Sequence, residues 1–363
     1  MNYTITKNDN KPAYLVLYNY LVNDIVNGVY PYGSKLPSKR LIAQETGVSV
    51  ITVQHSMELL CDEGYIEARE RSGFFVIYRA KDFQGAPNLF YTTHTEPVKR
   101  ILDDTEYTIP YGVISKIMRK VILDYDDRIL DRCPASGVLD LREEICLYLA
   151  RSRGIKVDVS QVIIGSGAEY LYGMIAQFFG TKEIFAIEDP SYEKIRKVYE
   201  IMGIKCEGLK LYPDGIAADD LNKTNAKVLH VTPFNSYPSG ISIGVSKKNE
   251  YIEWARKKGG VIVEDNYDSE LTVSSKPEDS LYSMADGENV IYMNTFSKTI
   301  YSSLRVGYMV IPLNMVDKFS EKLGFYSCTV PIFEQYVLTE FLRSGEYERH
   351  INRIRRKKRK LHN

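Results

Sequence analysis

Cysteine is scarce in this sequence, and so are long apolar runs. The five cysteines are scattered and odd in number, and no two form a C-x-x-C pair. This pattern argues against a disulfide framework and a zinc site, and it fits a reducing compartment. No stretch approaches the roughly 18 apolar residues of a membrane-spanning helix. The polar start, MNYTITKNDNK, has no signal-peptide core. We therefore expect a cytoplasmic protein without a membrane segment.

Excess charge of either sign is also absent, because 47 Lys and Arg balance 47 Asp and Glu. A neutral chain has no overall attraction to nucleic acid, so any DNA affinity must be local. Hydrophobic residues make up 44% of the 363 residues and charged residues 26%. This is the composition of a globular protein with room for two domains.

The first 80 residues have the pattern of a winged helix-turn-helix. Apolar spacing predicts a helix over 14–26, and Ser38 and Ser49 are expected to cap two further helices that end at Gly47 and Gly64. Two short strands, over 66–69 and 74–78, are expected to form a hairpin. The third helix of such a domain enters a major groove. The pattern alone fits a small protein-binding helical domain equally well.

The segment LPSKRLIAQETGVSVITVQHSMELLCDEGYIEARERSGFFV resembles the DNA-binding domain of GntR-type regulators. The resemblance implies binding to a double-stranded DNA operator through phosphates and base edges. It assigns DNA contacts to Arg40, Ser49, Thr52, His55, Arg69, Arg71, Ser72 and Gly73. The family usually has an arginine where this chain has Val50, which predicts a weaker affinity and a shallower salt dependence.

The remainder of the chain has an α/β pattern. Residues 80–96 lack periodicity and are expected to link a DNA-binding domain, 1–79, to a larger domain, 97–345. Helical patterns in the larger domain alternate with short apolar runs that predict buried, mostly parallel strands. These runs are 162–164, 184–187, 228–231, 261–263 and 290–293. Helices between parallel strands place functional sites at the carboxyl ends of the strands.

Polar residues at these strand ends suit an aldehyde phosphate. The amine of Lys298, in NTFSKTIYSSLRVGY, can condense with an aldehyde, and the Arg305 guanidinium can hold a phosphate. Asp265 follows the run 261–263, and an acid facing a ring nitrogen complements a lysine facing an aldehyde carbon in pyridoxal phosphate chemistry. The turn Ser166-Gly167-Ala168 offers backbone amides to a phosphate, although any tight strand-to-helix turn needs glycine.

Together, the motifs GSGAEYL, EDPSY, TPFNSYPSG, EDNYDSEL, FSK and SLRVGY resemble the aminotransferase-like domain of fold-type I pyridoxal phosphate enzymes. Behind a GntR-type head, this arrangement resembles the MocR/GabR family of bacterial regulators. The resemblance implies that Lys298 binds the aldehyde covalently, Asp265 pairs with the pyridine nitrogen, Tyr267 hydrogen-bonds the 3-hydroxyl and Tyr192 stacks on the ring. The implied phosphate ligands are Ser166, Gly167, Ala168, Thr295, Ser297 and Arg305.

The sequence departs from the family pattern at three places. Tyr237 stands where aminotransferases have an asparagine, and Asn266 where these regulators often repeat the aspartate. The chain from Pro331 onward is expected to be one long helix whose basic end, 346–363, leads toward a small domain for which no residues match. The eight basic residues from Arg349 to Lys360 either form a solvated face that meets this domain or attract DNA.

The resemblance implies a homodimeric transcription regulator, located in the cytoplasm at the nucleoid, whose pyridoxal phosphate domain senses an amine or amino-acid effector. Two other interpretations remain open. The first is an active aminotransferase with a DNA-binding head, for which the family's carboxylate-binding arginine has no match. The second is a cofactor-free DNA-binding dimer whose large domain only supports the fold.

Overall fold

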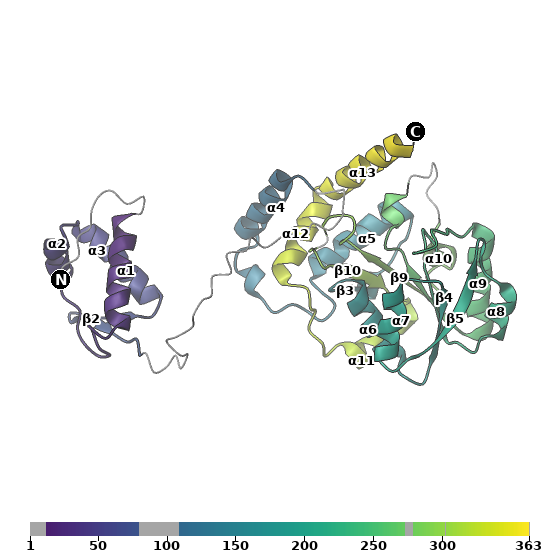
Figure 1. Cartoon of the computed structure of the whole chain (residues 1–363), viewed down its shortest axis with the longest axis horizontal. Helices are drawn as coiled ribbons and strands as arrows, with labels where there is room; N and C mark the ends of the chain where they lie inside the picture. Colours follow the sequence, from purple (N-terminus) through teal and green to yellow (C-terminus); the bar gives the residue numbers. More distant parts are fainter. Residues whose placement is uncertain (1–11, 80–108, 273–278, 302, 363) are drawn as a thin grey trace. The chain divides into compact units, whose positions relative to one another are not determined.

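The computed structural model describes residues 12–79, 109–272, 279–301 and 303–362. The chain divides into two compact units, Met1–Lys99 and Arg100–Asn363 (Figure 1). The predicted linker, 80–96, lies outside the described residues. Within the described ranges, no helix is long and apolar enough to cross a membrane.

The N-terminal unit is the predicted winged helix-turn-helix. Its described elements are α1 (Ala13–Val26), α2 (Lys39–Thr46), α3 (Val50–Asp62), β1 (Ile66–Arg69) and the antiparallel β2 (Gly73–Val76). Ser38 accepts a hydrogen bond from the Leu41 N–H at 3.3 Å, and Ser49 accepts one from the Thr52 N–H at 3.1 Å, so both predicted helix caps are formed. Residues from all three helices and both strands share one apolar core.

The second strand of this unit ends two residues earlier than predicted. Beyond Val76, the N–H groups of Ile77 and Tyr78 both donate to the carbonyl oxygen of Tyr65, at 3.0 and 3.2 Å. These two hydrogen bonds are not part of the β1–β2 pairing, so the strand ends at Val76.

An eight-stranded sheet forms the centre of the large unit, in the order β3-β10-β9-β8-β7-β4-β5-β6. The strands are β3 (Val162–Gly165), β4 (Ile184–Asp189), β5 (Lys205–Tyr212), β6 (Gly215–Ile216), β7 (Val228–Val231), β8 (Val261–Asp265), β9 (Val290–Thr295) and β10 (Gly307–Val310). Strands β9, β8, β7, β4 and β5 are parallel to one another, whereas β10 is antiparallel to both neighbours. The mostly parallel sheet that the sequence predicts is therefore present.

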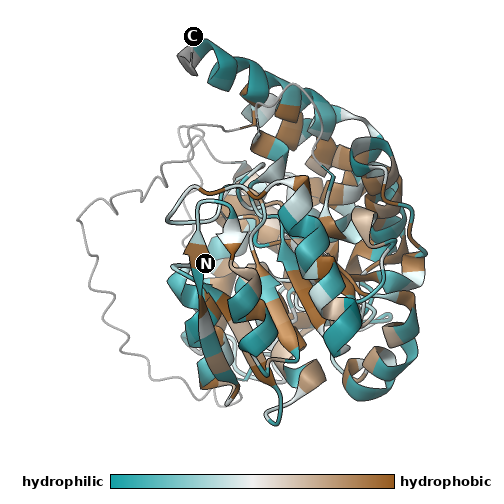
Figure 2. Ribbon diagram, turned by 90° about the vertical axis from the view of Figure 1, so that its right-hand side faces the viewer, coloured by the Kyte–Doolittle hydropathy of each residue, from teal (hydrophilic) through white to brown (hydrophobic). Residues whose placement is uncertain are grey.

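Helices cover both faces of this sheet and bury two apolar clusters. One face is covered by α6 (Ala168–Phe179), α7 (Glu193–Ile201) and α11 (Val316–Leu323). The other cluster includes residues of α4 (Tyr111–Asp124), α5 (Leu139–Arg153), α8 (Ala218–Lys223), α9 (Val245–Lys258), α10 (Leu281–Met284), α12 (Ile332–Arg343) and α13 (Glu346–His362). The described 3₁₀ turns are η2 (Asp126–Leu130), η3 (Val159–Gln161), η4 (Ser269–Leu271) and η5 (Leu313–Met315). Figure 2 shows brown, hydrophobic residues along the central strands and teal, hydrophilic residues on outer helical turns.

The single long helix predicted from Pro331 onward is wrong. Gly345 has a φ of 70°, in the left-handed region that glycine adopts without steric cost, and it separates α12 from α13. Its N–H donates to the Leu342 carbonyl oxygen at 3.0 Å, which closes the end of α12. The redirected α13 buries Tyr347, His350 and Ile351 against the large unit.

Candidate functional site

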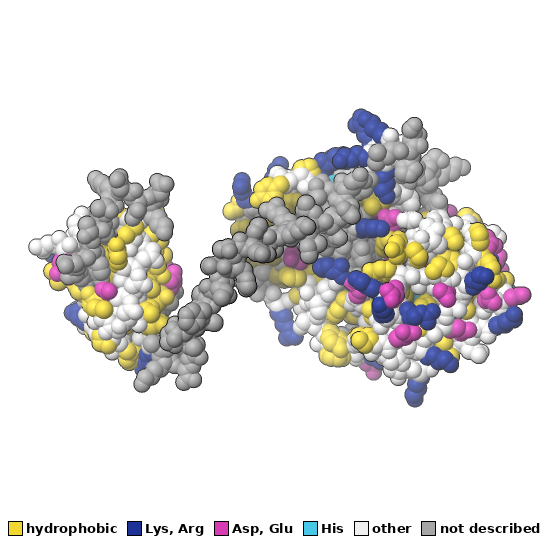
Figure 3. All heavy atoms as spheres, viewed as in Figure 1, with side chains coloured by type: hydrophobic (Ala, Val, Ile, Leu, Met, Phe, Trp, Pro, Cys, Tyr) yellow, Lys and Arg dark blue, Asp and Glu magenta, His cyan; other side chains and the backbone are white. Residues whose placement is uncertain are grey.

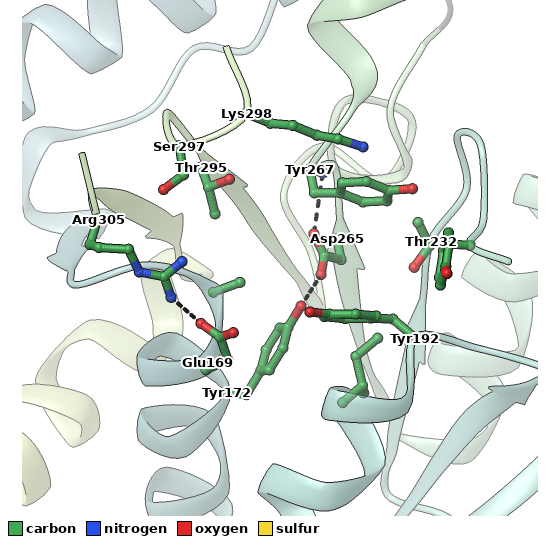
Figure 4. Close-up of a pocket in the computed structure, with 13 residues that line it drawn as sticks. Glu169, Tyr172, Tyr192, Thr232, Asp265, Tyr267, Thr295, Ser297, Lys298 and Arg305 are labelled. Carbon is green, nitrogen blue, oxygen red and sulfur yellow. Dashed lines mark hydrogen bonds and ion pairs between the residues drawn. The ribbon is translucent and has the colours of Figure 1, made fainter. Parts of the chain in front are cut away.

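A cavity of about 490 Å³ lies at the carboxyl ends of strands β7, β8 and β9 (Figure 4). Eight of the ten residues predicted to bind a cofactor line it. They are Ala168, Tyr192, Asp265, Tyr267, Thr295, Ser297, Lys298 and Arg305. Parallel strands collect their carboxyl ends at one edge, which is why segments distant in sequence meet here. The structure therefore brings most of the predicted residues together.

The other two predicted residues, Ser166 and Gly167, precede α6 and do not line the cavity. The Ser166 hydroxyl oxygen accepts a hydrogen bond from Thr329 Oγ1 at 2.9 Å. Gly167 has a φ of 90°, and a Cβ atom there would lie 3.0 Å from Arg305 Nη2. Glycine is thus required both for the backbone conformation and for the close approach of the guanidinium. Among the described residues, no side chain caps the N-terminus of α6, so its first backbone amides are available to an anion.

Asp265 is the last residue of β8, and only 2% of it is exposed. Its Oδ2 accepts a hydrogen bond from the Tyr172 hydroxyl at 2.5 Å, and its Oδ1 accepts one from the Tyr267 N–H at 3.2 Å. Burial, reinforced by the charge of Asp265, holds the pKa of Tyr172 well above its ordinary value, so Tyr172 stays a neutral donor. These two donors fix the orientation of the buried carboxylate.

The Lys298 side chain is 45% exposed and reaches across the Tyr267 ring. Its Nζ lies 4.3 Å from the centre of that ring and 3.7 Å from Asp268 Oδ1. Asp268 Oδ2 in turn accepts a hydrogen bond from Asn235 Nδ2 at 2.6 Å. The Tyr267 hydroxyl, expected to meet the cofactor's 3-hydroxyl, donates to the Asn235 carbonyl oxygen at 2.9 Å.

Arg305, the expected phosphate ligand, forms an ion pair with Glu169 in the first turn of α6 (Figure 4). Glu169 also accepts a hydrogen bond from Lys194 Nζ at 2.8 Å. Partial burial of Glu169 opposes ionisation, but Lys194 and Arg305 outweigh it and hold the pKa of this carboxyl below its usual value. A carboxylate therefore pairs with the guanidinium that the sequence assigns to a phosphate.

The sequence did not assign a site role to five of the cavity residues. They are Glu169, Tyr172, Ile195, Thr232 and Tyr237. Tyr172 lies one helical turn after Ala168, a spacing that signals a shared helix face. Tyr237 meets Tyr192 edge to face, with ring centres 6.0 Å apart, so the two aromatic rings form one wall.

The residues assigned to DNA contacts lie on α2, on α3 and in the β1–β2 hairpin of the N-terminal unit. Arg40 is exposed, and Arg71 and Gly73 have left-handed φ angles of 58° and 110° in the turn of the hairpin. Arg69 already pairs with Glu67 at 2.6 Å and lies over the Phe75 ring.

Three other assigned residues belong to α3. Ser49 and Thr52 take part in its N-terminal cap, and the exposed His55 packs edge to face against Tyr14. Ser72 is exposed in the hairpin turn.

On the face of the large unit seen in Figure 3, both signs of charge are intermixed.

The sequence matches two families along its length. Residues 13–76 match the gntR family of bacterial regulatory proteins, and residues 106–363 match aminotransferase class I and II. The HTH-type transcriptional regulator YdeL of Bacillus subtilis (strain 168) is 32% identical over 96% of this chain and 77% of its own length. The chain belongs to the MocR-type family of transcriptional regulators.

Two further members resemble this MocR-type chain over most of its length. The probable rhizopine catabolism regulatory protein MocR of Rhizobium meliloti is 26% identical over 95% of this chain and 74% of its own length. The pyridoxine biosynthesis regulator PdxR of Corynebacterium glutamicum is 24% identical over 92% of this chain and 73% of its own length. The chain is accordingly a DNA-binding regulator with a GntR-type head and an aminotransferase-like domain.

Solved aminotransferases share the fold of the large unit. The Pyrococcus horikoshii kynurenine aminotransferase has a TM-score of 0.63 and 24% identity, over 68% of this chain and 64% of its own. An archaeal alanine:glyoxylate aminotransferase has a TM-score of 0.62 and 22% identity, over 67% of this chain and 62% of its own. The chain thus spans less than two thirds of each of these two structures, and the likeness concerns the fold.

Proposed function

We propose that the aminotransferase-like domain of this regulator binds pyridoxal phosphate and senses an amine or amino-acid effector. The observation that carries the proposal is the meeting of three charged groups in one cavity: the Lys298 amine, the Asp265 carboxylate and the Arg305 guanidinium. These groups match an aldehyde, a pyridine nitrogen and a phosphate, which are the three polar parts of the cofactor.

Each residue has a distinct role in this proposal. The buried Asp265 carboxylate holds a proton on the ring nitrogen, and Tyr172 fixes the orientation of that carboxylate. Arg305 and the free amides of α6 hold the phosphate, while Tyr192 and Tyr237 cover the ring. When bound, the cofactor supplies an aldehyde that reacts reversibly with primary amines.

An effector amine that takes the place of Lys298 would free the lysine ammonium. Asp268 lies 3.7 Å from Lys298 Nζ and is positioned to stabilise the freed cation. The effector changes the conformation of the regulator only as far as it binds one state more tightly than the other. The Asp268 contact is one source of such a difference.

We also propose that the regulator is a homodimer on a double-stranded DNA operator, in the cytoplasm at the nucleoid. Large apolar side chains on and near α4 support a dimer, since Tyr111, Leu123 and Leu130 are 84%, 72% and 83% exposed. In this proposal the DNA-binding domain is 1–79, the linker 80–96, the aminotransferase-like domain 97–345 and the basic C-terminal segment 346–363. Light scattering at micromolar concentration tests the dimer, and a purely monomeric species would rule it out.

Borohydride reduction followed by peptide mapping tests the cofactor proposal. Protein incubated with pyridoxal phosphate and then reduced should carry the added mass on the peptide that contains Lys298. Lys194→Ala is a matched control, because it removes another amine close to the cavity, and it should leave this labelling intact. Label distributed over surface lysines, and unchanged in Lys298→Ala, would overturn the assignment. A keto acid formed from an added amino acid would identify a working aminotransferase instead.

A further inference from the structure

A second set of buried polar side chains lies next to Asp265. The imidazole of His230, on β7, is 1% exposed, and its Nε2 lies 3.7 Å from Asp265 Oδ2. Its Nδ1 lies 2.8 Å from the hydroxyl of Tyr199, a fully buried residue of α7. Tyr172 meets both the His230 and the Tyr199 rings, so the three side chains form one packed unit beneath the carboxylate.

The proton positions in this unit follow from the hydrogen-bond partners. Burial, reinforced by the charge of Asp265, holds the pKa of Tyr199 well above its ordinary value, so its hydroxyl keeps its proton. Among the described residues, His230 Nδ1 is the partner that this hydroxyl has. If Tyr199 donates to Nδ1, a neutral imidazole carries its own proton on Nε2.

The Nε2 atom has no hydrogen-bond partner among the described residues. A buried N–H group without an acceptor has lost its hydrogen bonds to water without a replacement, which is unfavourable. Asp265 Oδ2 is the nearby acceptor, and a shift of less than about 1 Å would bring it into hydrogen-bond range. The imidazole is therefore aimed at the carboxylate that faces the cavity.

We propose that His230, oriented by Tyr199, donates from Nε2 to Asp265 and holds this carboxylate in the orientation that faces the cofactor's ring nitrogen. His230 is a positioning residue, because it acts through Asp265. The inference rests on the proposed function, since it concerns the group that would hold the ring nitrogen's proton. It resembles the way in which a hydrogen-bonded outer partner fixes the orientation and protonation of a ligating side chain.

Other titratable groups also face Asp265. Tyr172 from α6 and Tyr267 after β8 are neutral hydroxyls, because burial raises the pKa of each above its ordinary value. The buried Glu188, on β4, carries a carboxyl whose pKa burial raises to about 8. Above that pH, its negative charge would oppose that of Asp265. The test therefore belongs near pH 7, where Glu188 is mostly protonated.

The experiment compares His230→Gln with His230→Asn in the full chain, loaded with pyridoxal phosphate that is ¹⁵N-labelled at the ring nitrogen. The Gln amide nitrogen can occupy the place of Nε2, whereas the shorter Asn amide reaches only the place of Nδ1. The ¹⁵N chemical shift reports directly whether the ring nitrogen is protonated. We expect wild type and His230→Gln to keep this nitrogen protonated at pH 7. In His230→Asn its titration should move about one pH unit lower, and the cofactor should dissociate about tenfold more readily.

Tyr199→Phe provides a second test that leaves the imidazole in place. Without the Tyr199 hydroxyl, the His230 tautomer with a proton on Nε2 is no longer preferred. The titration of the cofactor's ring nitrogen should therefore move to lower pH, by less than in His230→Asn. Identical ¹⁵N titrations in all four proteins would overturn the role of His230 while leaving Lys298 labelling intact. Wild type that fails to form a borohydride-stable adduct on Lys298 would overturn the proposed function itself.

Discussion

The imidazole Nε2 of His350 lies 2.8 Å from the backbone carbonyl oxygen of Thr299, the residue that follows Lys298. The Tyr347 hydroxyl, one turn earlier on α13, donates to Thr299 Oγ1 at 3.1 Å. Both contacts are buried, so α13 holds the lysine segment at two points. These two hydrogen bonds tie α13 to the residue that follows Lys298.

The His350 contact predicts a loss of stability in acid. Burial lowers the pKa of His350 below the ordinary value of 6.5, so the folded protein favours the neutral ring that donates to Thr299. A histidine with a depressed pKa contributes stability above about pH 6.5, and this contribution is lost as the pH falls below that value. The thermal unfolding temperature of wild type should fall below pH 6.5 more steeply than that of His350→Gln, because the Gln amide stays a neutral donor. Parallel pH profiles for the two proteins would contradict this role.

Glu188 predicts the opposite pH dependence. Its pKa rises from 4.5 to about 8 because the carboxyl is buried, so its contribution to stability is complete below pH 4.5 and is lost as the pH rises to about 8. In this interval, stability should fall by about 1.4 kcal/mol per pH unit at most. Glu188→Gln should flatten the measured unfolding free energy between pH 5 and 8. The exposed Glu193→Gln serves as a control and should leave the slope unchanged. A slope that persists in Glu188→Gln must come from another group.

The ion pair between Glu169 and Arg305 predicts a gain of cofactor affinity on mutation. Glu169 competes with the cofactor phosphate for the Arg305 guanidinium. Because both side chains are partly exposed, the competition is worth about 1 kcal/mol, and Glu169→Gln should bind pyridoxal phosphate several-fold more tightly. Arg305→Ala should weaken binding about tenfold or more. Fluorescence titration measures both. Equal affinities in wild type and Glu169→Gln would show that Glu169 does not compete.

Arg40 and Arg69 predict different effects on DNA binding, although both were assigned to DNA contacts. Arg40 is exposed on α2, whereas Arg69 already pairs with Glu67 at 2.6 Å. Arg40→Ala should lower DNA affinity uniformly across sequences and reduce the slope of log affinity against log salt by about 1. Arg69→Ala should have a smaller effect. The salt dependence of binding to one duplex measures both slopes, and the reverse ranking would exclude Arg40 as the main phosphate contact.

The sequence predicted the parts of the site that follow from strand ends and motifs. Asp265 was found because it follows a short apolar run that forms a parallel strand, and Lys298 because it shares the motif NTFSKTIYSSLRVGY with Arg305. Glu169 and His230 were missed, because their roles depend on which elements pack together. The long helix was wrong because its helical spacing continues across Gly345, which adopts a left-handed φ and ends α12.

Strand β10 was also missed, and the reason is local. Its residues Gly307–Val310 overlap the SLRVGY motif, which was interpreted as a phosphate-binding segment instead of a strand. In the structure, β10 is antiparallel to β3 and β9 and places Gly307 beside both Gly165 and Thr295. This register joins the turn before α6 to the segment that leads to Lys298.

The visible absorption spectrum of the protein with added pyridoxal phosphate, before and after borohydride, tests the central claim most directly. We expect a band in wild type that is absent in Lys298→Ala and that borohydride converts into a stable adduct. A spectrum equal to that of free cofactor, and the same in both proteins, would contradict a cofactor site at Lys298. The regulator would then be a DNA-binding protein whose large domain only supports the fold.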